Sequence, residues 1–241
     1  MMQDMSGNLR IEKTGREHAA VADVRQSQIV PYERSLNADS EWALNEGSRF
    51  FEGRSGVQEA LRRITRRLEE LGIPYAVAGG MALFHHGYRR FTDDIDILVT
   101  KSDREEIQQQ LTGRGYLPTF TRRKNLRDTE LGVKINFLTT GNDPGDGKPK
   151  PVAFPNPADV SIEKDGLRIL KLESLIELKL ASGLSAAHRL RDLADVQELI
   201  RLLDLPAEVA DSLHPSVRDK FLELRSAIEE SGAGPDEEVF E

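Results

Sequence analysis

The stretch that decides the fold is "AVAGGMALFHHGYRRFTDDIDILV", residues 76–99. Its apolar beginning, together with the preceding tyrosine, indicates a short buried strand over residues 75–78. Gly79 and Gly80 then indicate a tight turn that opens a helix lasting to about Gly87. A strand that ends in two glycines at a helix N-terminus presents backbone N–H groups to a phosphate without side chains in the way.

The second strand predicted in this stretch begins with acids, "DIDILVT", where a buried strand is normally apolar. Because side chains alternate between the two faces of a strand, Asp94 and Asp96 are expected on one face, while the isoleucines beside them point into the core. The same alternation, extended backwards, places Arg90 and Thr92 on the side of the acids. Two polar residues and two carboxylates therefore share one face.

Two interpretations account for this acidic pair. Carboxylates this close repel each other, and a hard divalent cation such as Mg²⁺, held by one or two carboxylates and otherwise by water and phosphate oxygens, compensates them. The alternative is a solvent-facing strand whose acids pair with Arg89 or Arg90. The glycine turn upstream favours the metal interpretation.

The composition sets limits on the class of protein. The chain has 241 residues, no cysteine and a formal net charge of −8, which argues against a surface devoted to nucleic acid. Basic residues exceed acidic ones over residues 54–127, so a local patch for a polyanion is compatible with the acidic total. No window is apolar enough to span a membrane, and no secretory signal is recognisable. We therefore expect a cytoplasmic protein without a membrane partner.

The hydrophobic pattern divides the chain into four parts. We predict a poorly ordered leader over residues 1–50, for which docking through "WALNEGSRFF" is left open, and an α/β core over 51–170. A helical region over 171–230 and an acidic disordered tail over 231–241 follow. Within the core, the Gly- and Pro-rich stretch "GNDPGDGKPKPVAFPNP" is expected to be an exposed loop.

The stretch resembles the nucleotidyltransferase superfamily of DNA polymerase beta, in which a Gly-Gly or Gly-Ser turn opens a helix and D-x-D follows on a strand. The resemblance is closest to the AbiEii-like nucleotidyltransferases of bacterial abortive-infection and toxin–antitoxin systems. "GGMALFHHGYRRFTDDIDIL" matches their glycine turn, arginine and acidic pair, and "LIELKLAS" and "RLRDLADV" resemble their later lysine and aspartate motifs. The resemblance implies a nucleotidyltransferase fold, in which a mixed β-sheet is flanked by helices and followed by an α-helical C-terminal part.

Carried over to this sequence, the resemblance implies roles for specific residues. The implied metal ligands, for Mg²⁺ or Mn²⁺, are Asp94 and Asp96. The implied catalytic residues are Asp94, Asp96, Lys179 and Asp192, and the implied nucleotide-binding residues are Gly79, Gly80, Arg90, Thr92 and Lys179. Lys179 also lies on the buried stripe of its predicted helix, which a lysine that reaches the surface along its stem would equally explain. Arg189 and Arg191 would explain Asp192 and Asp195 as ordinary helix-surface ion pairs.

The sequence departs from the superfamily at one position. Many members carry a third carboxylate on a later strand, whereas the matching strand here, "GVKINFL", offers Asn136. An amide cannot accept a proton at neutral pH, so the base is elsewhere, with Asp192, Glu130 and Asp128 as candidates, or little base help is needed, or activity has been lost.

Two functions follow. The first is Mg²⁺-dependent transfer of a nucleoside monophosphate from an NTP to an acceptor, which by resemblance is an RNA 3′ end such as tRNA, in a toxin-like role beside an antitoxin partner. A protein hydroxyl and a small molecule remain alternatives. The second is a catalytically inactive module that acts by nucleotide or partner binding.

Overall fold

A computed structural model describes residues 29–119 and 124–232. Within them, one mixed sheet has the strand order β3-β4-β5-β2-β1-β7-β6. The strands are β1 (Ala76–Ala78), β2 (Asp94–Val99), β3 (Tyr116–Pro118), β4 (Leu126–Asp128), β5 (Lys134–Thr139), β6 (Ser161–Lys164) and β7 (Leu167–Leu170). β2 pairs in parallel with β5 and antiparallel with β1, so the predicted α/β class with a mixed sheet is confirmed.

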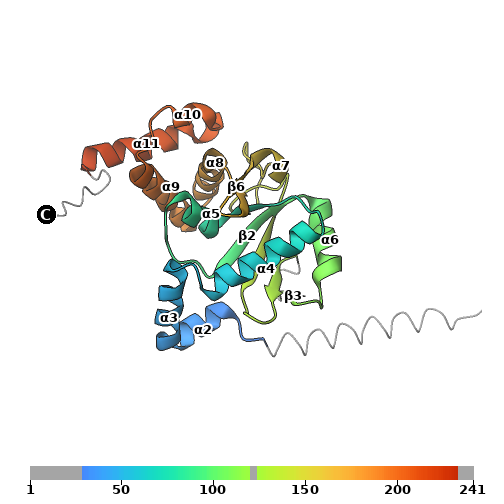
Figure 1. The fold of residues 1–241 in the computed structure, drawn as a ribbon. Helices are drawn as coiled ribbons and strands as arrows, with labels where there is room; N and C mark the ends of the chain where they lie inside the picture. The colour runs from blue at the N-terminus through green and yellow to red at the C-terminus, as the bar shows by residue number, and fades with distance from the viewer. Residues whose placement is uncertain (1–28, 120–123, 233–241) are drawn as a thin grey trace, which may run out of the picture.

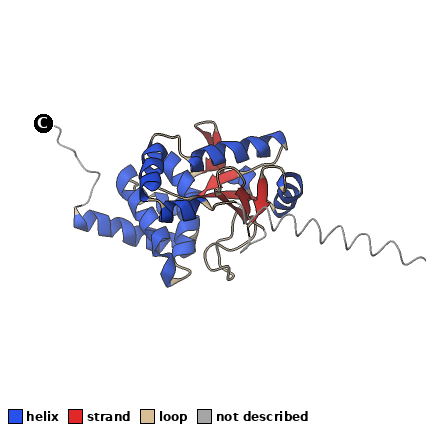
Figure 2. Ribbon diagram, turned by 90° about the horizontal axis from the view of Figure 1, so that it is seen from below, coloured by secondary structure: helices blue, strands red, loops and turns tan. Residues whose placement is uncertain are grey.

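Helices cover both faces of this sheet (Figure 1). The helices are α2 (Tyr32–Ala38), α3 (Ser40–Phe51), α4 (Gly56–Glu70), α5 (Gly79–His86), α6 (Lys101–Leu111), α7 (Pro157–Val160), α8 (Leu172–Gly183), the 3₁₀ turn η1 (Ala187–Arg189), α9 (Leu190–Leu203), α10 (Val209–Ser212) and α11 (Pro215–Ser231). The helices α8, α9, α10 and α11 lie together at one end of the molecule (Figure 1), and Figure 2 shows the strands in red with helices in blue on either side. No helix in the described part of the chain is long and apolar enough to cross a membrane.

The two faces of β2 belong to different cores. Ile95, Ile97 and Val99 pack with α4 and α6, whereas Leu98 packs with α8 and α9. Since side chains alternate along the strand, Asp94 and Asp96 lie on the face of Leu98. The fold therefore turns the acidic pair toward the C-terminal helices.

The prediction of a poorly ordered leader over residues 1–50 is wrong from residue 32 onward, where α2 and α3 form. Tyr32 and Phe50 are buried, and the Tyr32 hydroxyl donates to Glu46 Oε2 at 2.8 Å. The same Glu46 oxygen accepts the Gly56 N–H at 2.9 Å. Scattered apolar residues thus anchor short helices through tertiary contacts, which a search for sustained periodicity misses. Residues 1–28, and the tail from residue 233 on, lie outside the described residues.

The burial of Phe50 allows a direct test of whether α3 packs on the core. Its ring is fully buried and contacts Phe84 and Phe91, whereas the neighbouring Phe51 is 53% exposed. We expect Phe50→Ala to lower the free energy of unfolding by about 3–5 kcal/mol, because it leaves a cavity between α3 and the core. Phe51→Ala is the matched control and should change it far less. Urea denaturation measures both, and equal effects would mean that α3 does not pack on the core.

Candidate active site

The glycine turn brings the start of α5 into contact with β2. Gly79 has φ +57°, and a Cβ placed on it would lie 2.0 Å from Asp96 Oδ2. A Cβ on Gly80 would lie 2.8 Å from Thr92 Cβ. Both positions therefore need glycine, and the first-turn N–H groups of α5, which no side chain caps, lie beside the acids.

Asp94 and Asp96 are held side by side by an amide. Asn136 is the register partner of Asp96 on β5, and its Nδ2 donates to Asp94 Oδ2 at 2.9 Å and to Asp96 Oδ1 at 3.0 Å. Thr92 Oγ1 donates to the other Asp94 oxygen at 3.2 Å, and Lys134 Nζ lies 3.8 Å from Asp94 Oδ2. Asn136 thus occupies the place beside the acids where the superfamily often has a third carboxylate.

Burial and the neighbouring charge of Asp94 raise the pKa of Asp96 to about 7. The hydrogen bond from Asn136 and the positive charges of Lys179 and Lys134 oppose this shift without cancelling it. Without a cation, the ionised pair is therefore destabilised near neutral pH, and an added positive charge would favour ionisation.

This raised pKa predicts how stability depends on pH. The unfolded chain loses the Asp96 proton near pH 4, about the reference value, whereas the folded protein holds it to about pH 7. Stability is therefore lost as pH rises between these values, and the full penalty is present above pH 7. In the presence of EDTA, Asp96→Asn should raise the melting temperature at pH 8, and this gain should shrink toward pH 4. A pH-independent gain would contradict the assigned shift. The exposed Asp159→Asn serves as the control.

A second charged group faces the acids from α8 and α9. Asp195 is buried and accepts from Arg90 Nε at 2.6 Å, from Arg90 Nη2 at 2.8 Å and from Lys179 Nζ at 2.6 Å. Burial alone would raise the pKa of Asp195, but the Arg90 hydrogen bond and the charge of Lys179 outweigh it and lower the pKa. Asp192 accepts from Lys179 Nζ at 3.1 Å and from Ser182 Oγ at 2.7 Å.

These contacts correct the interpretation of Asp192 and Asp195 as helix-surface pairs. Arg189 does approach Asp192, at 3.7 Å, but Asp195 pairs with Arg90 and Lys179. The sequence does contain a signal for this buried ion pair. A lysine on the buried stripe of a helix needs a buried anion as its partner, and Asp195 directly precedes Val196, which is buried.

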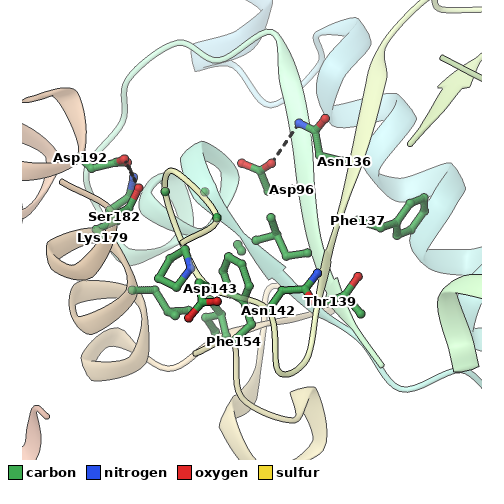
Figure 3. Close-up of a pocket in the computed structure, with 18 of the residues that line it drawn as sticks. Asp96, Asn136, Phe137, Thr139, Asn142, Asp143, Phe154, Lys179, Ser182 and Asp192 are labelled. Carbon is green, nitrogen blue, oxygen red and sulfur yellow. Dashed lines mark hydrogen bonds and ion pairs between the residues drawn. The ribbon is translucent and has the colours of Figure 1, made fainter. Parts of the chain in front are cut away.

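A cavity of about 890 Å³ lies between the acidic pair on β2 and the charged residues of α8 and α9. Figure 3 shows Asp96 and Asn136 on one side, with Lys179, Ser182 and Asp192 opposite. Of the predicted site residues, Gly79, Asp94, Asp96, Lys179 and Asp192 line the cavity. Gly80, Arg90 and Thr92 do not line it. Gly80 instead lies close to Thr92, and Arg90 forms an ion pair with Asp195.

Comparison with known proteins matches residues 33–215 to a family described as uncharacterised nucleotidyltransferases. The chain belongs to this nucleotidyltransferase family. No curated protein matches it. Among solved structures, ANT(2″)-Ia in complex with adenylyl-2″-tobramycin has 15% identity and a TM-score of 0.40, covering 72% of this chain and 97% of that one. JHP933 from Helicobacter pylori has 16% identity and a TM-score of 0.38, covering 73% and 93%. The narrower AbiEii-like assignment stays a prediction.

The cavity is also lined by a loop between β5 and α7. Residues 141–147, together with Phe154, line the cavity, and Arg189 Nη2 donates to the Gly145 carbonyl at 3.1 Å. The Gly- and Pro-rich composition of this segment predicts a rigid surface loop within reach of substrate. It gives no sign of the end of α8 and the η1 turn against which the loop folds.

The oxygen ligands that this cavity offers suit a cation that takes only one or two ligands from the protein. Within the described residues, no three His, Cys, Asp or Glu side chains are grouped as metal ligands. Asp94 and Asp96 alone suit Mg²⁺ or Mn²⁺, since Mg²⁺ is commonly held by one or two carboxylates with substrate phosphates and water completing its shell. Two neighbouring carboxylates without a cation between them also account for the raised pKa of Asp96.

Proposed function

We propose that this nucleotidyltransferase moves a nucleoside monophosphate from an NTP to an acceptor hydroxyl, using Mg²⁺ or Mn²⁺ on Asp94 and Asp96. The observation that carries the proposal is a single cavity with the acidic pair and the start of α5 on one side and Lys179 on the other. A triphosphate needs what these elements offer, namely N–H donors, a compensating cation and a lysine charge.

In the proposed reaction, the acceptor oxygen forms a bond to the α-phosphorus while the bond to the oxygen bridging the β-phosphate breaks. Pyrophosphate leaves, and the acceptor gives up its proton. The N–H groups of Gly79 and Gly80 would bind phosphate oxygens, and Lys179 would neutralise charge that develops on them. The divalent ion, when bound, supplies further charge neutralisation and orients the reacting groups.

Among the candidate bases, Asp192 fits this proposal best. Asp128 is fully buried, and one of its oxygens caps the turn that follows it. Glu130 pairs with Arg63 at 2.6 Å on the α4 side of the sheet. Neither of them lines the cavity, whereas Asp192 does. The proton of the acceptor would therefore pass to Asp192 or to water.

The acceptor is proposed from the AbiEii-like resemblance as an RNA 3′ end such as tRNA, in a toxin role with a cognate antitoxin, in the cytoplasm of a bacterium. Lys124 and Lys134 line the cavity and give it positive charge suited to a polyanion.

The test has two stages. Melting curves with each of the four NTPs, with Mg²⁺ or with EDTA, identify the nucleotide by metal-dependent stabilisation. The selected NTP, labelled at its α-phosphate, is then incubated with bulk tRNA and with lysate, and label transfer and pyrophosphate are measured. The absence of stabilisation by any NTP would refute the proposal.

A second candidate function is a module that binds nucleotide without transferring it. The observation that favours it is Asn136, an amide in the place of the third carboxylate. Stabilisation by an NTP together with no pyrophosphate release, across RNA, protein and small-molecule acceptors, would favour this second candidate over the first.

A further inference from the structure

Two asparagines connect the backbone of β5 to the acidic pair. The Phe137 N–H donates to Asn125 Oδ1 at 3.4 Å, and Asn125 Nδ2 donates to Asn136 Oδ1 at 2.8 Å. Asn136 Nδ2 then donates to both Asp94 and Asp96. Asn125 is 4% exposed, so water competes little for its amide.

The direction of this chain of hydrogen bonds is fixed at both ends. A backbone N–H can only donate, so Asn125 must present its oxygen to Phe137 and its nitrogen to Asn136. In the ionised form that binds a cation, both carboxylates can only accept, so Asn136 must present its nitrogen to them. Turning the Asn136 amide over would set N–H against N–H at Asn125 and oxygen against oxygen at the acids. Both ends therefore enforce the same orientation.

This orientation decides what Asn136 offers to a cation. The side-chain oxygen, the atom that coordinates hard cations, faces Asn125, while the face toward the acids carries N–H groups. Catalytic sites with two metal ions place them about 3.5–4 Å apart, and such a pair needs negative ligands to hold it. Here two carboxylates offset the charge of one divalent ion, and Lys134, 3.8 Å from Asp94, already supplies a further positive charge.

We propose that the Asn125–Asn136 pair takes the place of a second metal ion, so that this site holds one divalent cation per bound nucleotide. The inference rests on the proposed function, because it assumes that Asp94 and Asp96 bind the ion. It adds that this chain works with the nucleotide-bound ion alone, and that the amide pair keeps the carboxylates together where other sites use a second ion.

The experiment counts manganese and does not depend on activity. The full chain is saturated with Mn²⁺ and the non-hydrolysable α,β-methylene analogue of the NTP that the melting curves select. Protein-bound Mn²⁺ is measured by equilibrium dialysis with metal analysis. We expect one ion per nucleotide in the wild type and two in Asn136→Asp, which supplies the missing carboxylate. Asn142→Asp adds the same carboxylate to the cavity-lining loop and should keep one.

The outcomes separate this inference from the function on which it rests. Two ions in the wild type would overturn the inference and leave the proposed function standing. One ion in a folded Asn136→Asp would also overturn it, because something other than the amide would then exclude the second ion. No protein-bound Mn²⁺ in the wild type would remove the proposed function itself. The melting curve of Asn136→Asp shows whether this variant folds. If it does not fold, the number of Mn²⁺ ions bound by the wild type still tests the inference.

Discussion

Asp94→Asn and Asp96→Asn should each abolish Mg²⁺-dependent stabilisation by NTP and lower nucleotidyl transfer by at least about a hundredfold, which is about 2.7 kcal/mol. Each carboxylate already lies within hydrogen-bond distance of the shared amide of Asn136, so both are oriented toward the same point. An amide in place of either one removes half of the negative charge that a divalent ion needs. Melting curves with NTP and label transfer measure the two effects.

The fold should survive these substitutions, because each relieves repulsion within the pair and an asparagine oxygen can still accept from Asn136. Asp159→Asn, at an exposed acid of α7, is the control for a lost negative charge. If both variants bind NTP with unchanged affinity in the presence of metal, the metal assignment is wrong.

The arrangement of the acidic pair could be predicted from the sequence because strand alternation sets it within a few residues, and Asn136 was found by matching a later strand to the superfamily pattern. Strand alternation places Asp94 and Asp96 on one face, and the register of β2 with β5 puts Asn136 beside them. The two glycines were predicted as a phosphate turn. In the structure they are also required by the close approach of Asp96 and Thr92.

The other half of the site depends on contacts between residues far apart in the chain. Arg90 and Asp195 are 105 residues apart and form a bidentate ion pair that no local pattern indicates. Arg90 was predicted to bind nucleotide, yet its guanidinium is held by Asp195, so a direct nucleotide contact stays a prediction. The helices α2 and α3 were missed for a similar reason, since Phe50 is stabilised by rings from α5 and the segment before β2.

Removal of the Lys179 charge should lower nucleotidyl transfer by about tenfold to a thousandfold, or roughly 1.4–4 kcal/mol, if this lysine stabilises charge in the transition state. Lys179→Met keeps the apolar stem, and the side chain lines the cavity opposite the acids. Its ammonium also lies between two carboxylates, at 2.6 Å from Asp195 and 3.1 Å from Asp192. Stability should therefore fall as well, by less than the 3–5 kcal/mol typical of a broken buried pair, because Arg90 still compensates Asp195.

A double-mutant cycle separates the two effects, because the loss of stability comes from uncompensated charge. Adding Asp192→Asn to Lys179→Met removes one positive and one negative charge together, so the melting temperature should return toward that of Asp192→Asn alone. If Lys179 acts on the nucleotide, transfer by the double variant should remain about tenfold to a thousandfold below that of Asp192→Asn. If Lys179 only balances the two aspartates, transfer should recover to the level of Asp192→Asn along with stability. Equal specific activity in the double variant and in Asp192→Asn would thus assign Lys179 a structural role. The loss of transfer in Lys179→Met would then be caused by repulsion between Asp192 and Asp195 on α9, which the lysine no longer compensates.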